Sequence, residues 1–188
     1  MSELSHTPAG RRPLWIALLL LASLALSLGF ACAVPLAAFA AIAALTLARR
    51  DAFALIGAVW FANQIAGFTI HHYPIELSTF AWGFALGGVA LVSTLAAQAV
   101  TDQFRRGGGA AAAAFVLAFA VYEGSLFAIS VFAGSEVSDF APSVAGRVMA
   151  INAAAFAALY LIHRLGVFTG IASYQVPPRL AGERKVQA

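Results

Sequence analysis

Residues 52–76, AFALIGAVWFANQIAGFTIHHYPIE, decide the fold of this chain. They follow the pair Arg49-Arg50 and stay apolar for about the 30 Å thickness of the hydrocarbon core of a membrane, before two histidines and Pro74 end the run. This length and composition predict a helix that spans a membrane. At 3.6 residues per turn, one face of that helix carries polar and aromatic side chains. They are Trp60, Gln64 and His71, with Gly67 on the same face and Asn63 beside it.

A polar stripe on an apolar helix has to face protein or a cavity, because an unsatisfied amide in hydrocarbon costs roughly 2–7 kcal/mol. Two interpretations follow. Asn63 and Gln64 either form hydrogen bonds with a neighbouring helix, or they line a binding pocket together with Trp60 and His71.

Composition sets the class of protein. The chain has 188 residues, of which 62% are hydrophobic and 10% charged, with a mean hydropathy of +0.88. This is more apolar surface than a soluble domain of that length can bury, so the chain is expected to be an integral membrane protein. The net charge of +3 comes from short basic pairs between apolar segments, which favours membrane topology signals over a nucleic-acid surface. The single cysteine, Cys32, excludes an intrachain disulfide and a cysteine metal cluster.

The remaining apolar segments predict an all-α bundle of six transmembrane helices in residues 13–168, between polar tails at 1–12 and 169–188. Residues 13–48 are too long for one span and are expected to form two short helices folded back near 29–35, where Pro35 supplies the break. Further spans are predicted at about 77–100, 110–132 and 143–168. The fourth span contains Gly83-x-x-x-Gly87, a spacing that allows another helix to approach closely.

The basic residues predict the orientation. The six-span arrangement places Arg147 alone on one side and all other lysines and arginines on the opposite side. By the positive-inside rule both termini are cytoplasmic, and the loops at 71–76 and 133–143 face outward in a bacterial-type inner membrane. One alternative stays open: the double arginine at 11–12 and Ala31-Cys32-Ala33 also fit a secretory signal with a cleavage site.

Ionisable residues within spans point to function, because each is costly unless it is paired or hydrated. Glu123 lies slightly outward of the middle of the fifth span, and Arg147 lies near the outer end of the sixth. These charges share the outer half of the membrane with the polar residues of the other spans, which predicts a pocket for a small molecule. The candidate binding residues are Trp60, Asn63, Gln64, His71, Trp82, Tyr122, Glu123, Arg147 and Asn152. The alternative for Glu123 and Arg147 is a structural ion pair.

Other classes of function are weaker matches to the sequence. His71, His72 and Glu76 could instead bind a metal ion in a cobalt- or nickel-type permease, although adjacent histidines on a helix point about 100° apart. No pair of histidines is placed to hold haem, and no cofactor is predicted. Ser125 has no nearby base to activate it, so the chain is not predicted to be an enzyme. An intramembrane enzyme or a purely structural membrane protein remain alternatives.

With these features, the chain resembles the small six-helix substrate-binding (S) components of energy-coupling-factor (ECF) transporters, in size, topology and position of the pocket. In that family, alanines four residues apart in the first helix dock a membrane coupling subunit. Here Ser23, Ser27 and Ala31 have that spacing in the first span, and Ala40, Ala44 and Ala48 have it in the second. The resemblance implies uptake of a vitamin-like solute, with a coupling membrane subunit and ATPase subunits as partners.

Overall fold

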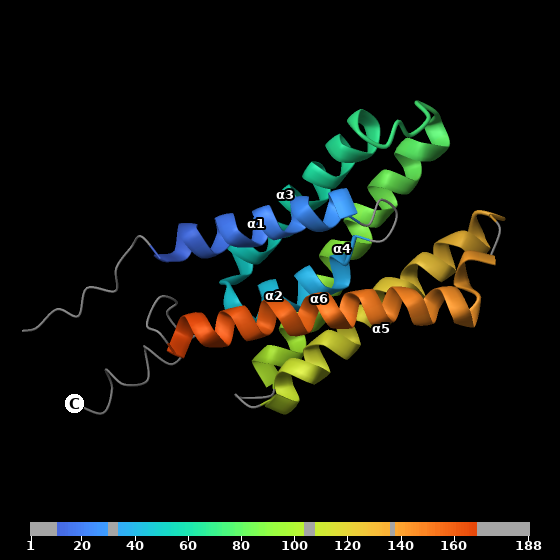
Figure 1. The fold of residues 1–188 in the computed structure, drawn as a ribbon. Coiled ribbons are helices and arrows are strands. Elements are labelled where there is room, and N and C mark those ends of the chain that lie inside the picture. Colours follow the sequence, from blue (N-terminus) through green and yellow to red (C-terminus); the bar gives the residue numbers. More distant parts are fainter. Residues whose placement is uncertain (1–10, 30–33, 104–107, 136–137, 169–188) are drawn as a thin grey trace, which may run out of the picture.

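The computed structural model describes residues 11–29, 34–103, 108–135 and 138–168, and these form six α-helices and one 3-10 turn (Figure 1). The elements are α1 (Arg11–Gly29), α2 (Leu36–Thr46), α3 (Arg49–Thr69), α4 (Leu77–Gln103), α5 (Gly108–Phe132), η1 (Ser138–Phe140) and α6 (Pro142–Phe168). The predicted all-α fold with six helices is confirmed. The last three helices begin and end within three residues of the predicted limits. Residues 1–10 of the first predicted tail, the whole of the second (169–188) and Cys32 lie outside the described residues.

The breaks between helices follow local chemistry. Helix α1 ends at Gly29 and α2 begins at Leu36, directly after Pro35, so the predicted fold-back near 29–35 is confirmed. After α5, Gly134 has a φ of 65°, a left-handed conformation that glycine adopts without a Cβ penalty. Helix α6 then begins at Pro142, where the missing backbone N–H of proline costs no helical hydrogen bond.

Four of the helices, α3 to α6, are long and apolar enough to cross a membrane by length and composition. The two shorter apolar stretches are Pro13–Ser23 within α1 and Leu36–Thr46, which is α2. At 1.5 Å per residue the 11 residues of α2 extend roughly 16 Å, about half of the hydrocarbon thickness. The second apolar segment is therefore a half-length helix and not a complete span.

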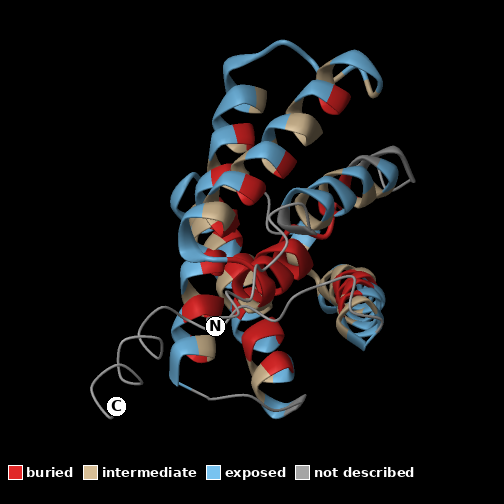
Figure 2. Cartoon of the chain, turned by 90° about the vertical axis from the view of Figure 1, so that its left-hand side faces the viewer, coloured by how far each residue is buried: buried red, intermediate tan, exposed pale blue. Residues whose placement is uncertain are grey.

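Helix α2 lies at the centre of the molecule (Figure 2) and contacts α3, α4, α5 and α6. Every residue from Leu36 to Ala44 is buried. Its sequence, LAAFAAIAALT, is apolar on all sides, and such a helix is stable only where all sides are covered. Six alanines keep it thin enough for four neighbours to surround it. Ala40 and Ala44 belong to this interior, so their alanine repeat is not on the surface for a coupling subunit to contact.

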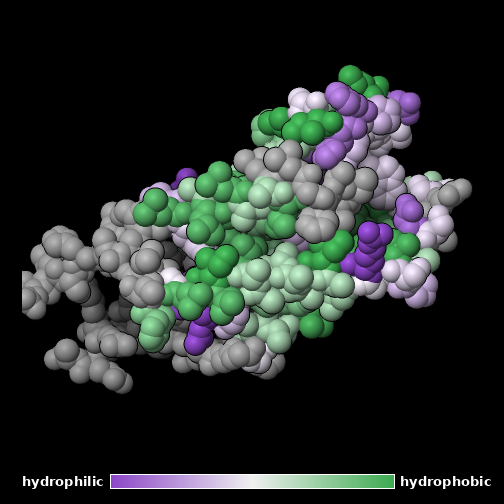
Figure 3. All heavy atoms as spheres, viewed as in Figure 1, coloured by the Kyte–Doolittle hydropathy of each residue, from purple (hydrophilic) through white to green (hydrophobic). Residues whose placement is uncertain are grey.

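The helix ends and the turns between helices gather at two opposite ends of the molecule. At one end, here called the terminal end, α1 begins, α2 joins α3 at Leu47–Ala48, and α6 ends (Figure 1). At the opposite, distal end lie the turn from α3 to α4 (residues 70–76) and the turn from α5 to α6 (residues 133–141). On the face shown in Figure 3, apolar residues cover the middle of the molecule, and most of the strongly hydrophilic residues lie towards the distal, right-hand end.

Helix α1 is joined to the centre near the terminal end. The indole Nε1–H of Trp15 donates a hydrogen bond of 3.0 Å to the hydroxyl oxygen of Thr46 in α2. The hydroxyl of Thr46 in turn donates to the carbonyl of Ile42. The ring of Trp15 also packs on the buried His163 of α6, with centroids 5.2 Å apart. One aromatic side chain thus connects three helices.

Candidate functional site

The polar stripe of α3 faces protein, and it packs on α4. The indole Nε1–H of Trp60 donates a hydrogen bond of 2.7 Å to the backbone carbonyl of Gly83. A Cβ atom added to Gly87 would lie 2.8 Å from the indole of Trp60, and one added to Gly83 would lie 2.6 Å from Oε1 of Gln64. The Gly83-x-x-x-Gly87 notch therefore receives two large side chains of α3, which confirms its predicted role in helix approach.

Helix α3 ends at Thr69, so the prediction that His71 lies on one helical face with Trp60 and Gln64 is wrong: His71 lies in the turn that follows the helix. The ring of Tyr73 covers Gly67, where an added Cβ would lie 2.7 Å from two ring carbons. The imidazole of His71 stacks on the same tyrosine, with centroids 5.9 Å apart. His72 is exposed and has a φ of 52°. Among the described residues, no group of three His, Cys, Asp or Glu side chains is arranged to hold a metal ion, so the geometry gives no support to the alternative site at His71, His72 and Glu76.

Two further candidates lie on the sides of α3 and α4. Trp82 is half-buried and packs against the hydrophobic core. Asn63 is half-buried on α3, beside the stripe that faces α4. Neither is brought to the other candidate residues by a hydrogen bond that the structure shows. Their predicted role in binding stays a prediction.

The side chain of Asn152 forms a hydrogen bond with the backbone at the start of the central helix α2. Its side chain is 1% exposed. Its Oδ1 accepts a hydrogen bond of 3.1 Å from the backbone N–H of Ala38, and its Nδ2 donates to the carbonyl of Val148 at 3.0 Å. The first N–H groups of a helix have no partner within the helix. Because α2 begins inside the protein, where water cannot supply one, Asn152 of α6 satisfies one of these donors.

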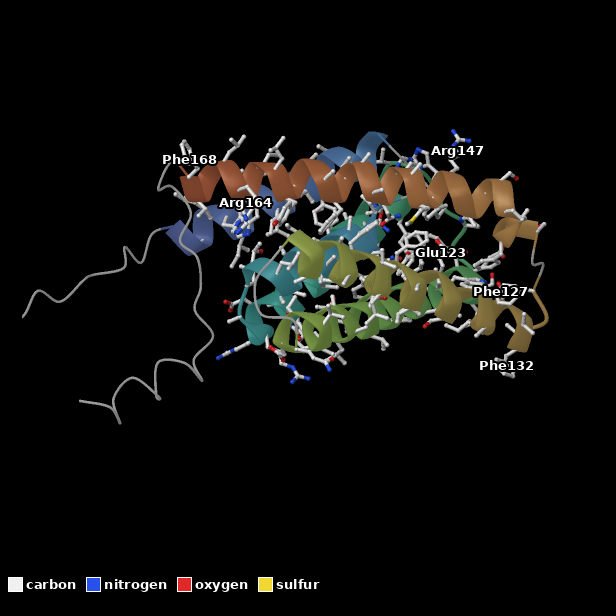
Figure 4. All side chains as sticks on the ribbon, turned by 90° about the horizontal axis from the view of Figure 1, so that it is seen from below. Glu123, Phe127, Phe132, Arg147, Arg164 and Phe168 are labelled. Carbon is white, nitrogen blue, oxygen red and sulfur yellow. The ribbon has the colours of Figure 1, made fainter. Side chains whose placement is uncertain are left out.

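Tyr122 and Glu123 lie on α5 in the distal half of the bundle. Tyr122 is buried, with 6% of its surface exposed, and it belongs to the core that surrounds α2. Glu123 is half-buried and lies between the ribbons of α5 and α6 (Figure 4). Counting nine residues from Glu123 to Phe132 places this carboxylate roughly 14 Å from the distal end of α5.

The structure does not bring Arg147 to Glu123. Arg147 is exposed, and in Figure 4 it extends from the side of α6 that is remote from α5. The buried side of α6 carries Asn152, Ala155, Phe156, Leu159 and His163. Arg147 precedes Asn152 by five residues, which is roughly 140° around the helix. Since Asn152 faces inward, Arg147 faces away from the bundle.

Two aromatic residues near Glu123 were not among the sequence candidates. Phe127 follows Glu123 by four residues, so the two side chains share one face of α5. Phe127 meets Phe140 of η1 edge to face, with centroids 5.4 Å apart, and Figure 4 shows it next to the turn towards α6. The spacing from Glu123 was a usable signal for Phe127. Phe140 had no such signal, because its position depends on how the turn folds.

The candidate site is therefore the region between α5 and the distal half of α6, at Tyr122, Glu123, Phe127 and Phe140. It contains one half-buried carboxylate beside aromatic rings, and the start of α2 lies deeper in the same bundle. Among the residues that the structure describes, none forms an ion pair with Glu123. No protein family model, curated protein or solved structure matches this chain, so its family is not identified by comparison.

Proposed function

We propose that this chain is a multi-pass membrane protein that binds a small solute at Glu123, as the solute-binding subunit of an uptake system driven by partner ATPases. One observation carries the proposal: a half-buried carboxylate lies between α5 and α6, within a candidate membrane span, without a charge partner on the described part of the chain. An ionisable side chain in such a position is costly, and it is typical of a substrate or ion site.

The membrane location is supported by the surface of the long helices. Large apolar side chains are exposed on each of them, including Phe61 on α3, Phe84 on α4, Val116 on α5 and Leu161 on α6. In water such surface is unfavourable, whereas lipid accommodates it. The start of α1 and the end of α6 then lie on the side of Arg49, Arg50 and Arg164, which the positive-inside rule assigns to the cytoplasm.

Helix α2 fits this arrangement as a half-length helix enclosed by protein. Its backbone is satisfied inside the bundle by its own hydrogen bonds and by Asn152, so it does not need to cross the bilayer. Helices that start or stop at mid-membrane depth are typical of transporter binding sites. Asn152, which binds the start of α2, lies ten residues from the distal start of α6, and Glu123 lies nine residues from the distal end of α5, so the two positions are at similar depth.

Binding is favoured over catalysis by the chemistry available. The region has one carboxylate and aromatic residues, and among the described residues no three His, Cys, Asp or Glu side chains gather to hold a metal ion there. Two groups with separate roles are the usual minimum for acid–base or nucleophilic catalysis. We therefore assign the energy of transport to other subunits.

The test is solute binding by the isolated chain. The full chain is purified in mild detergent without partner proteins or nucleotide, and bound small molecules are extracted and identified by mass spectrometry. We expect a solute to copurify with the natural chain. Glu123→Gln should weaken its binding roughly 10- to 100-fold, since hydrogen bonds to a charged group contribute about 1.5–3 kcal/mol.

Glu76→Gln is the matched control, because Glu76 is an exposed carboxylate on the turn from α3 to α4. It should leave solute binding unchanged. If no solute copurifies with the natural chain and none binds on addition, the proposed function is wrong.

A further inference from the structure

We infer that the solute held at Glu123 is an organic cation. The inference rests on the proposed function and adds to it the chemical class of the solute. It follows from where the structure places the charges of this chain, because a buried or half-buried carboxylate in an apolar span needs a positive partner.

Among the residues that the structure describes, no lysine or arginine forms an ion pair with Glu123. Arg147, the basic residue nearest to the distal end of α6, is exposed and points away from α5 (Figure 4). Arg49, Arg50 and Arg164 lie towards the terminal end. The short segments 30–33 and 136–137, which lie outside the described residues, contain no lysine, arginine or histidine; the other such segments, 1–10, 104–107 and 169–188, do contain basic residues. No described basic side chain accompanies Glu123, so we assign the role of its positive partner to the solute.

The aromatic residues around the carboxylate suit the same ligand. Phe127 lies one turn from Glu123 on the same face of α5, and its ring meets that of Phe140. Tyr122, the preceding residue, is buried in the core that surrounds α2 and is not counted among these rings. Aromatic faces attract ammonium and similar groups through their quadrupole, while their apolar surface covers the carbon atoms of an organic solute.

A metal ion is a poorer match for this site. Calcium takes six to eight oxygen ligands, and magnesium requires a nearly ideal octahedron. Transition metals prefer several nitrogen or sulfur ligands. Within the described ranges, no three His, Cys, Asp or Glu side chains gather in any one place. A single carboxylate with an aromatic ring one helical turn away offers too few ligands for these ions, and it fits a compact organic cation.

The experiment uses three small probes of the same shape that differ in charge. They are choline as the cation, 3,3-dimethylbutan-1-ol as its neutral analogue, and 3,3-dimethylbutanoate as an anion. The purified full chain in detergent is heated with each probe at millimolar concentration, and the shift in Tm is measured. In parallel, the charge of any copurified solute is read from its mass spectrum.

We expect choline to raise the Tm of the natural chain by several degrees, the neutral alcohol to raise it less, and the anion to have no effect. Glu123→Gln should abolish the advantage of choline over the alcohol, and Glu76→Gln should preserve it. The copurified solute should carry a positive charge. Glu123→Asp, which shortens the side chain but keeps the charge, should retain part of the preference for choline. A cooperative melting transition of Glu123→Gln itself shows that its loss of preference is not loss of folding.

Two results would overturn the inference. If the alcohol or the anion protects the chain as well as choline does, or if the copurified solute is neutral or anionic, the protein binds a solute but not by its positive charge, and only the chemical class is wrong. If no probe protects and no solute copurifies, both the class and the proposed function are wrong.

Discussion

Gly87 shows how a single missing methyl group determines the packing of two helices. The indole of Trp60 occupies the space where a Cβ of Gly87 would lie, and its N–H reaches the carbonyl of Gly83 one turn away. The indole is rigid and is held by this hydrogen bond, so it has little freedom to give way. At Gly83 the nearest atom is instead the end of the flexible side chain of Gln64.

We therefore predict that Gly87→Ala destabilises the protein by about 1–3 kcal/mol, because overpacking forces Trp60 out of its position. Gly83→Ala should cost less, since the amide of Gln64 can rotate away. Gly88→Ala is the matched control on the next residue, because nothing lies within 4 Å of an added Cβ there. It should leave Tm unchanged or slightly raised, since alanine favours helix. Equal losses at Gly87 and Gly88 would contradict this packing.

The polar stripe of α3 also shows what could be predicted from single residues. The spacing of Trp60 and Gln64 predicted a shared face that meets protein, and this is confirmed by their contacts with α4. Whether that face lines a pocket or packs on a helix depends on the partner. Spacing alone carries no information about it.

At the scale of elements, α2 depends on α6 for the start of its backbone. The N–H of Ala38 is buried, and its partner is Oδ1 of Asn152 from a helix more than 100 residues later in the chain. Removing the amide leaves this donor unsatisfied inside the protein. A buried donor without a partner costs about 1–3 kcal/mol.

Asn152→Ala is thus expected to lower the stability by that amount, measured as Tm in detergent. Asn63→Ala is the control, because Asn63 is also an amide in a candidate span but is only half-buried. It should cost less. An unchanged Tm for Asn152→Ala would mean that the start of α2 is held by other contacts.

The helix limits were predictable because the chain marks them with proline, glycine and charge, as at Pro35, Gly134 and Pro142. The burial of α2 was not predictable, because an apolar helix looks the same whether lipid or protein surrounds it. The direction of Arg147 had a signal in the roughly 140° that separates it from Asn152. The sequence did not show which of the two faces inward. Asn152 faces inward because it accepts a hydrogen bond from the N–H of Ala38 in α2. This pairing depends on how α2 and α6 pack, so the sequence alone could not predict it.

For the whole molecule, the orientation in the membrane decides what the candidate site can do. Glu123 lies roughly 14 Å from the distal end of α5, so a solute from that side reaches it across less than half of the bilayer. If the distal end faces outward, the site captures solute for uptake. If it faces the cytoplasm, the same site loads solute for export.

The basic residues predict that the distal end faces outward, and cysteine labelling of intact cells tests this. In a Cys32→Ser background, Ser135→Cys introduces a thiol in the turn between α5 and α6, and Gln103→Cys introduces one at the exposed end of α4. A membrane-impermeant maleimide should label position 135 on intact cells, and it should label position 103 only after the cells are permeabilised. Each position serves as the control for the other, because the two lie at opposite ends of the bundle and neither is buried. The reverse pattern would make the arginine-rich end external. The organic cation would then have to enter from the cytoplasm, and the chain would belong to an efflux system in spite of its basic residues.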